Sequence, residues 1–419
     1  MSIRKVIPKP IKKYLKSKML MLVPYDIRTH YQTENASLRR KLRMSEQTNR
    51  TKDFHLSAIS KLHDDVVERA WNNDTEINKW ICMKPFERIR IQEDGEVFSC
   101  CSVQAKWGHS YGNVFTHSYE EIWNSDNAKK MRYCVSKGSF EYCYDYCPNK
   151  LKIGQNFFPR EQSPYKFERW QDCHIDTSPK IVNLAVDKSC NLSCVICRNN
   201  VKIASRDESE RILDMLINVV RPMLKNCEII DFSTGEFFVS YANQEFVKTL
   251  CSKEFPLLKL KIFTNALLLT PSKWDEFETV HDMMSTIAVS IDAATNETYE
   301  AVRRGGSFDK LCCNMEFISS LRREGKIDLL DLSFVVQERN FKEMEMFFEM
   351  GKKWNVDSIR YKRLISHGVY THDSFSQSDV FNPNHPNYDE AKRMLQNVKK
   401  NSGSLRIYEN CLSVAELED

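Results

Sequence analysis

The chain has 419 residues, of which 42% are hydrophobic, which excludes a disordered or fibrous protein and predicts two or three globular domains. Its longest early apolar run, residues 19–23, is shorter than the hydrophobic core of a signal peptide and far shorter than a membrane span. Fifteen cysteines without a secretory signal predict a cytoplasmic protein whose thiols are free or metal-bound, not a disulfide framework.

Positive charge is concentrated at the N-terminus. Residues 1–50 carry 13 Lys or Arg and three acids, although the whole chain is only +4, so the rest of the chain is net negative. We interpret this segment as an exposed, partly helical arm. It could contact nucleic acid, an acidic membrane surface or an acidic leader segment of a substrate, or be a solvated tail. The negative remainder makes nucleic acid the least favoured partner.

After this arm, the apolar residues between 54 and 71 recur at three- or four-residue steps and predict an amphipathic helix. Residues 82–150 follow as a cysteine-rich block. Strand-like pieces at 88–92 and 97–99 surround the turn Asp94-Gly95, and a helix is expected near 118–135. This pattern indicates a small metal-binding module without a large core.

From residue 180 onward, short apolar runs alternate with helical stretches, which predicts an α/β fold. The runs are 181–186, 229–232, 260–263, 286–291, 332–336 and 358–361. Six strands separated by helices imply a parallel sheet that closes toward a barrel, a partial (β/α)6 TIM-like barrel. The tail after about Arg363 is interpreted as loop plus one helix, 388–400. In barrels of this kind the chemistry gathers at the carboxyl ends of the strands.

Three cysteines stand at that position after the first of these strands, in the order Cys190-x-x-x-Cys194-x-x-Cys197. This spacing lets one short loop place three thiolates around one face of a cubane iron–sulfur cluster and leaves one iron open. A structural zinc site is the alternative, although it would normally have four closed ligands.

This motif after the first strand of a βα array resembles that of the radical S-adenosylmethionine (SAM) superfamily. The resemblance implies that the open iron binds the amino and carboxylate groups of SAM. An electron from the reduced cluster would cleave the sulfonium to methionine and a 5′-deoxyadenosyl radical, which abstracts hydrogen from a substrate. The protein would orient the cofactor and exclude water.

Other positions match the superfamily in chain order. Gly235-Glu236, preceded by Thr234 where the family has glycine, resembles the motif that holds the methionyl ammonium. Further matches imply that the cofactor is contacted by Ile196 (at adenine), Thr264 and Asn265 (a Thr-Asn signature), Ser290 and Asp292 (at ribose), and Arg304 (at the carboxylate).

The earlier cysteine block resembles a SPASM domain, an auxiliary-cluster module often joined to radical SAM enzymes. The resemblance implies one auxiliary [4Fe-4S] cluster, with zinc as the alternative, whose ligands would be Cys82, Cys100, Cys143 and Cys147. A second cluster would lack a ligand, because Lys137 stands where its second cysteine belongs. Cys101, Cys134 and Cys173 therefore remain spare. The module precedes the barrel, whereas it normally follows it.

These patterns divide the chain into an arm (1–75), a SPASM-like module (76–175), a radical SAM partial barrel (176–365) and a C-terminal loop and helix (366–419). The favoured function is a radical SAM enzyme, of the oxidoreductase or maturase type, acting on a peptide or protein side chain, with flavodoxin or ferredoxin as reductant. Two alternatives remain open: action on a sugar or small metabolite, and a non-catalytic iron–sulfur protein that binds a partner or transfers electrons.

Overall fold

The computed structural model describes residues 76–100, 110–140, 143 and 156–411, all within one compact unit that spans residues 67–419. The predicted helix at 54–71 and the basic arm lie outside the described residues. None of the described helices is long and apolar enough to cross a membrane.

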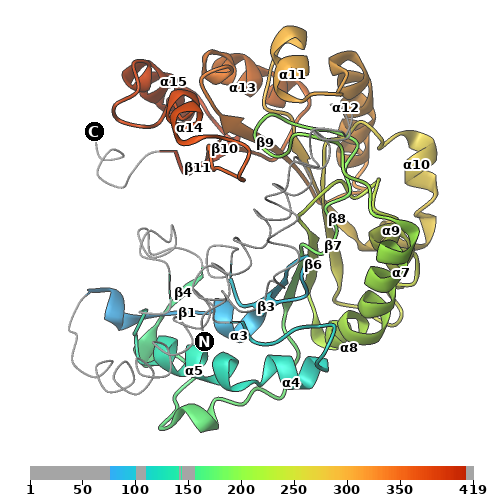
Figure 1. Cartoon of the computed structure of the whole chain (residues 1–419), viewed down its shortest axis with the longest axis vertical. Coiled ribbons are helices and arrows are strands. Elements are labelled where there is room, and N and C mark those ends of the chain that lie inside the picture. Colours follow the sequence, from blue (N-terminus) through green and yellow to red (C-terminus); the bar gives the residue numbers. More distant parts are fainter. Residues whose placement is uncertain (1–75, 101–109, 141–142, 144–155, 412–419) are drawn as a thin grey trace, which may run out of the picture. The chain divides into compact units, whose positions relative to one another are not determined.

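Nine strands form one sheet in the order β11-β10-β9-β8-β7-β6-β5-β2-β3, and only β2 and β3 pair antiparallel (Figure 1). Its strands are β2 (Arg88–Ile91), β3 (Val97–Phe98), β5 (Ile181–Leu184), β6 (Ile229–Phe232), β7 (Lys259–Thr264), β8 (Met284–Ser290), β9 (Leu329–Val336), β10 (Ser358–Arg363) and β11 (Arg406–Glu409). Strands β1 (Trp80–Cys82) and β4 (Phe157–Pro159) form a separate antiparallel pair. The six strands from β5 to β10 confirm the predicted partial barrel.

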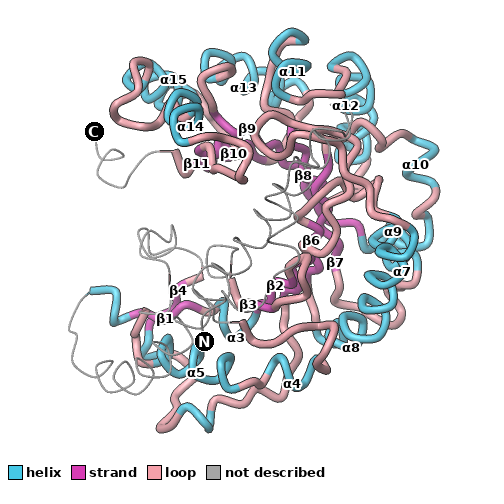
Figure 2. The backbone as a smooth tube through the Cα atoms, in the orientation of Figure 1, coloured by secondary structure: helices cyan, strands magenta, loops and turns pink. Residues whose placement is uncertain are grey.

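Helices connect these strands (Figure 2). The α-helices are α3 (Lys84–Glu87), α4 (Tyr119–Trp123), α5 (Asp126–Ser136), α7 (Arg206–Met215), α8 (Arg221–Met223), α9 (Tyr241–Lys248), α10 (Pro271–Asp275), α11 (Asn296–Val302), α12 (Phe308–Arg323), α13 (Met344–Lys353), α14 (His372–Ser378) and α15 (Tyr388–Lys400). A π-helical segment, Leu216–Val220, joins α7 to α8. Short 3-10 helices lie at Glu76–Lys79, Arg160–Gln162, Trp170–Asp172, Leu224–Asn226, Glu278–Met283 and Phe341–Glu343.

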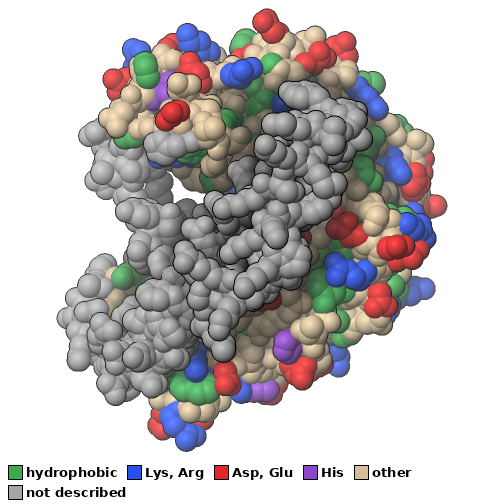
Figure 3. Space-filling model, in the orientation of Figure 1, with side chains coloured by type: hydrophobic (Ala, Val, Ile, Leu, Met, Phe, Trp, Pro, Cys, Tyr) green, Lys and Arg blue, Asp and Glu red, His purple; other side chains and the backbone are tan. Residues whose placement is uncertain are grey.

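Local sequence explains where the helices between the barrel strands begin. A Ser or Thr side chain accepts a hydrogen bond from a backbone N–H of the first turn in α7, α9, α10, α11 and α12. Such caps satisfy donors that the helix itself leaves unpaired. The segment predicted as one helix at 118–135 is instead two, because Ser125 caps a new helix directly after α4 ends. On the face seen in Figure 3, positive and negative side chains of the described residues are interspersed.

Two strands outside the predicted six correct the sequence interpretation. Strand β2, expected in a separate small module, pairs in parallel with β5 and continues the barrel sheet. The C-terminal tail was expected to hold one helix, which α15 matches in its bounds, but it also contains α14 and strand β11, which pairs in parallel with β10. Both strands are four residues long, too short for their pairing to be evident from periodicity.

Candidate active site

The three motif cysteines lie on the loop that follows β5. Asp187 begins this loop and accepts hydrogen bonds from Ser189 N at 2.7 Å and Ser240 Oγ at 2.5 Å, which ties the loop to the N-terminus of α9. The backbone of Ser193 also donates to the carbonyl oxygen of Arg304 at 3.1 Å. The loop is therefore held at the carboxyl ends of the strands by contacts with two distant segments.

Each of the three sulfur atoms of this loop accepts a hydrogen bond from nitrogen. The pairs are Leu192 N to Cys190 Sγ at 3.4 Å, Arg198 Nε to Cys197 Sγ at 3.4 Å, and Arg303 Nη1 to Cys194 Sγ at 3.7 Å. Burial raises the pKa of the Cys190 thiol, so this cysteine needs a positive partner such as a metal to be held as thiolate. Hydrogen bonds from N–H groups to the ligand sulfurs are one of the features that set the reduction potential of an iron–sulfur cluster.

Glu236 lies next to this loop, directly after β6, and is almost fully buried. Its carboxylate accepts hydrogen bonds from Thr264 Oγ1 at 2.7 Å, from Asn265 N at 2.6 Å and from Phe238 N at 3.2 Å. Burial is the largest influence and raises the pKa of Glu236 to about 7, against the lowering effect of these donors. The Thr-Asn pair after β7 therefore orients the acid after β6.

Gly235 is required by its surroundings. Its φ is +71°, and a Cβ atom at this position would lie 2.6 Å from the carbonyl oxygens of both Asp187 and Ser189. The backbone N–H of Glu236 donates to the same Ser189 carbonyl at 2.7 Å. A side chain at 235 would therefore separate Glu236 from the cysteine loop.

Asn265 connects the Glu236 region to the first cysteine. Its side-chain nitrogen donates to Asn191 Oδ1 at 2.9 Å and lies 4.0 Å from Cys190 Sγ. The structure therefore brings Gly235, Glu236, Thr264 and Asn265 together against the loop that carries the cysteines. Ile196 is half-buried on the same loop and packs on the hydrophobic core. Thr234, which replaces the usual glycine, is half-buried beside Gly235.

Asp292 and Arg303 form an ion pair that sequence reasoning did not identify. The distance from Arg303 Nη2 to Asp292 Oδ2 is 2.7 Å, and both side chains are nearly inaccessible to solvent. Asp292 Oδ1 accepts a further hydrogen bond from Val335 N at 2.7 Å. The carboxylate that we predict at the ribose thus also orients the guanidinium that faces Cys194. The Arg303-Arg304 dipeptide could not reveal which of its two arginines is buried.

Arg304 is exposed and contacts the cysteine loop. Its Nε donates to Ser193 O at 2.7 Å and its Nη2 donates to Arg198 O at 2.9 Å. These bonds fix the backbone on both sides of Cys194 and Cys197. The predicted role of Arg304 at a carboxylate stays a prediction, as does that of Ser290, which is half-buried at the end of β8.

The structure describes three of the four cysteines that we predict as ligands of the auxiliary cluster. Cys82 lies on β1, and the charges of Cys100 and Cys143 both act on the ionisation of Tyr111. Cys101 and Cys147 lie outside the described residues. Cys134 and Cys173, which we left as spare, are buried, and burial raises the pKa of Cys173 to about 12.

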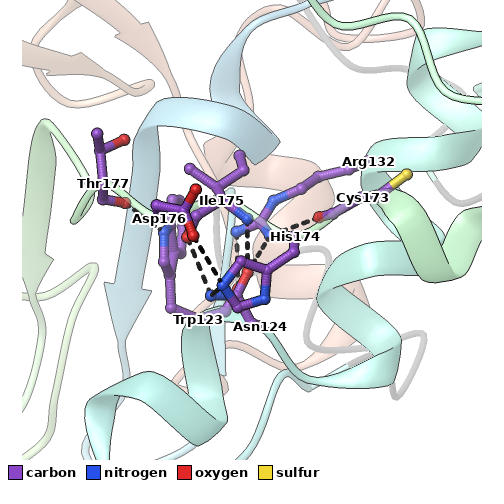
Figure 4. Close-up of polar contacts among 8 residues, drawn as sticks. All are labelled: Trp123, Asn124, Arg132, Cys173, His174, Ile175, Asp176 and Thr177. Atoms are coloured by element: carbon purple, nitrogen blue, oxygen red, sulfur yellow. Dashed lines mark hydrogen bonds and ion pairs between the residues drawn. The ribbon is translucent and has the colours of Figure 1, made fainter.

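A buried arginine holds this part of the chain together (Figure 4). Arg132 in α5 lies 4.2 Å from the ring centroid of Trp123 and is fully buried. Its guanidinium donates to Pro85 O, Trp123 O, Cys173 O and Asn124 Oδ1, at distances of 2.7–3.2 Å. Asn124 in turn bonds both backbone groups of Ile175. Arg132 therefore connects α3, α4 and the segment that leads into β5.

Comparison with known protein families gives the decisive observation. Residues 187–351 match the model of the radical SAM superfamily, and this range contains all three motif cysteines. The chain contains a radical SAM domain. Residues 82–149 match the SPASM model, an iron-sulfur cluster-binding domain, and this match precedes the radical SAM domain as expected from the sequence. The two domains imply a [4Fe-4S] cluster with SAM and auxiliary iron–sulfur binding.

Several solved structures are similar to the chain at low identity. SuiB of Streptococcus suis bound to S-adenosylmethionine gives a TM-score of 0.40 at 13% identity, covering 56% of this chain and 51% of SuiB. Native anSMEcpe with bound AdoMet gives 0.40 at 17%, covering 55% and 63%. TYW1 with a lysine-pyruvate adduct gives 0.33 at 16%, covering 54% and 72%. The chain thus spans about half the length of the SuiB chain, and the family assignment rests on the two domain matches.

The residues of the radical SAM domain fit the cluster that its family implies. The donor set is three thiols on one loop, and each sulfur faces an N–H group. Among the described residues, no three His, Cys, Asp or Glu side chains surround a common point as they would around a single metal ion. A cubane differs from such a site because each thiolate binds a different iron. Cys190, Cys194 and Cys197 could therefore hold the cluster, with Glu236 beside it.

Proposed function

We propose that this radical SAM enzyme abstracts hydrogen from a peptide or protein side chain. The observation that carries the catalytic site is the arrangement of three N–H-bonded cysteine sulfurs next to the buried Glu236. When bound, the cluster and SAM supply a 5′-deoxyadenosyl radical by reductive cleavage of the sulfonium. The superfamily assignment supports this chemistry, and the SPASM match supports the substrate class, because SPASM-bearing relatives often modify peptides.

The side chains of the site have distinct proposed roles. Glu236, ionised and held by Thr264 and the Asn265 backbone, receives an ammonium group of the cofactor. A carboxylate that is already fixed by three donors loses little conformational freedom when it binds this cation. Asp292 keeps the Arg303 guanidinium against Cys194, and its carboxylate could accept a hydrogen bond from a hydroxyl group of the cofactor.

The cysteines of the SPASM domain have a proposed role of their own. Cys82, Cys100, Cys143 and Cys147 would hold one auxiliary [4Fe-4S] cluster, which when bound could supply an electron acceptor or a substrate-binding site. A small reducing protein such as flavodoxin or ferredoxin would supply the electron for SAM cleavage.

The test is the formation of 5′-deoxyadenosine. The full chain would be purified anaerobically, loaded with iron and sulfide, and given dithionite and SAM. We expect product from the wild type and none from Cys194→Ala. Cys313→Ala removes an exposed thiol on α12 and is the matched control, which should behave as the wild type. A fully loaded cluster without SAM cleavage would refute the enzymatic proposal in favour of electron transfer or partner binding.

A further inference from the structure

The two faces of the parallel sheet differ in polarity. Side chains alternate along a strand, and the face toward the helices carries buried apolar residues such as Ile230, Ile262 and Leu332. The opposite face, here called the inner face, carries charge. Strand register places Arg90, Asp231 and Lys261 in one row across β2, β6 and β7. The polar face of this sheet is therefore a surface inside the barrel and not an outer, solvated one.

Two lysines of the inner face converge although they come from strands three apart. The ammonium nitrogen of Lys261, on β7, lies 5.2 Å from the ring centroid of Phe263. The ammonium nitrogen of Lys362, on β10, lies 5.8 Å from the same centroid. The two ammonium groups can thus be no farther apart than the sum of these distances. Two like charges near one ring repel each other, and an anion bound between them would offset this repulsion.

The acids of the inner face have other partners. Asp331 forms an ion pair with Arg360 at 3.1 Å and accepts a hydrogen bond from Ser358 at 2.5 Å. Asp231, next to Lys261 in the register, lies 3.9 Å from Arg88. Within the described part of the chain, neither lysine ammonium forms an ion pair or a hydrogen bond with an acid. Lys261 and Lys362 are thus two positive side chains of the inner face that have no acid partner among the described residues.

Electrostatic interactions connect Lys362 to the residues that contact the cluster loop. Burial lowers the pKa of Lys362, and the nearby charges of Arg360, Arg303 and Lys261 lower it further, against the opposing effect of Asp292. Lys362 thus lies within the electrostatic reach of the Asp292–Arg303 pair, whose guanidinium contacts Cys194. Strands β8 and β9 lie between the two lysine-bearing strands and carry the small side chains Ala288 and Ser333 on the inner face.

We propose that Lys261 and Lys362 bind an oxyanion of the substrate, either a phosphate or a carboxylate, and so select an anionic substrate for the radical reaction. This inference rests on the proposed function, because it names the substrate class of the same site. Each ammonium offers three N–H donors, and two ammonium groups on either side of one anion provide charge-assisted hydrogen bonds in a partly buried setting. Arg360, already paired with Asp331, borders the site.

The test is a calorimetric titration of the full, cluster-loaded chain at constant ionic strength. Two probes are used in separate titrations, inorganic pyrophosphate and glutarate. We expect the wild type to bind at least one probe. Lys261→Met/Lys362→Met keeps the side-chain length and removes both charges, and it should weaken binding about 30-fold or more. Preference for pyrophosphate would assign a phosphate group, and preference for glutarate a carboxylate.

The matched control is Lys342→Met. Lys342 also lies over an aromatic ring, at 5.6 Å from the Phe341 centroid, but it is exposed on a 3-10 helix outside the inner face. This variant should bind the probes as the wild type does. Lys261→Arg/Lys362→Arg retains both charges and should retain binding, which keeps the proposal testable if the methionine variant does not fold. Circular dichroism and cluster absorbance report folding.

Two results would overturn the inference: a wild type that binds neither probe, or a folded Lys261→Met/Lys362→Met variant with wild-type affinity. The assay of 5′-deoxyadenosine separates this inference from the proposed function. SAM cleavage without anion binding would refute only the anionic substrate. Lysine-dependent anion binding without SAM cleavage would refute only the radical reaction.

Discussion

The two cysteine-bearing regions of this protein are built in opposite ways. In the radical SAM domain, three cysteines within eight residues lie on one loop, and distant segments bring N–H groups to their sulfurs. In the SPASM domain, the cysteines are spread along the chain, and a buried cation, Arg132, joins the segments between them. In the first region the cysteines are already close in sequence, and the fold adds hydrogen-bond donors around them. In the second region the cysteines are distant in sequence, so only tertiary contacts can bring their segments together.

The largest expected effect is that of Arg303→Met in the radical SAM domain. It leaves Asp292 buried without its partner and removes the donor to Cys194. Breaking a buried ion pair from one side typically costs about 3–5 kcal/mol. Urea unfolding of the full chain measures this loss. Arg322→Met breaks the more exposed Arg322–Asp357 pair and should cost about 1 kcal/mol or less. Equal losses for the two variants would contradict the structural role of Arg303.

Arg132→Met tests the other region. The substitution leaves carbonyl groups of Pro85, Trp123 and Cys173 without their donor. Each buried unsatisfied acceptor costs about 1 kcal/mol or more, so we expect a loss of about 3 kcal/mol in unfolding free energy. The matched control is Arg169→Met, because Arg169 is exposed and forms an ion pair with its neighbour Asp172. If Arg132→Met were as mild as this control, tertiary contacts would not be what assembles the SPASM domain.

Gly235→Ala tests the close approach between Glu236 and the cysteine loop. The added Cβ would collide with two carbonyl oxygens in a left-handed backbone conformation, so we expect about 2 kcal/mol or more of destabilisation and weakened SAM binding. Gly325→Ala is the matched control, because Gly325 has φ of +69° but no atom within 4 Å of the added Cβ. It should cost about 1 kcal/mol. A calorimetric affinity for SAM that is unchanged in Gly235→Ala would argue against this contact.

The smallest expected effect is a pH dependence of cofactor binding. The pKa of Glu236 is raised to about 7, so its carboxylate is mostly protonated at pH 6 and mostly ionised at pH 8. A cationic ammonium requires the ionised form, so SAM affinity should rise with pH and be about 10-fold tighter at pH 8 than at pH 6. Titration of SAM across this range measures the change. Glu236→Gln should abolish the dependence; if it persists there, another group is titrating.

The same contrast explains how far the sequence could predict the structure. The six central strands were predictable because each is a short apolar run between helical stretches. The cysteine loop was predictable because its spacing is local. Strand β2 could not be assigned to the barrel, since its partner β5 begins 90 residues later and only pairing decides the sheet. The sequence could not distinguish Arg303 from Arg304. Arg303 is buried because it pairs with Asp292, which is not adjacent to it in sequence, and the residues next to the two arginines give no sign of this.

Pairing of β2 with β5 also limits how this protein can change over evolutionary time. The SPASM domain supplies strand β2 to the sheet of the radical SAM domain, so neither domain completes its fold without the other. Deleting residues before β5 would leave that strand as an open sheet edge, with its backbone groups exposed to pairing with other chains. Recombination that exchanged only the module would require a matching edge strand from the donor. We therefore expect the two domains to be inherited together, although each is matched by a separate family model.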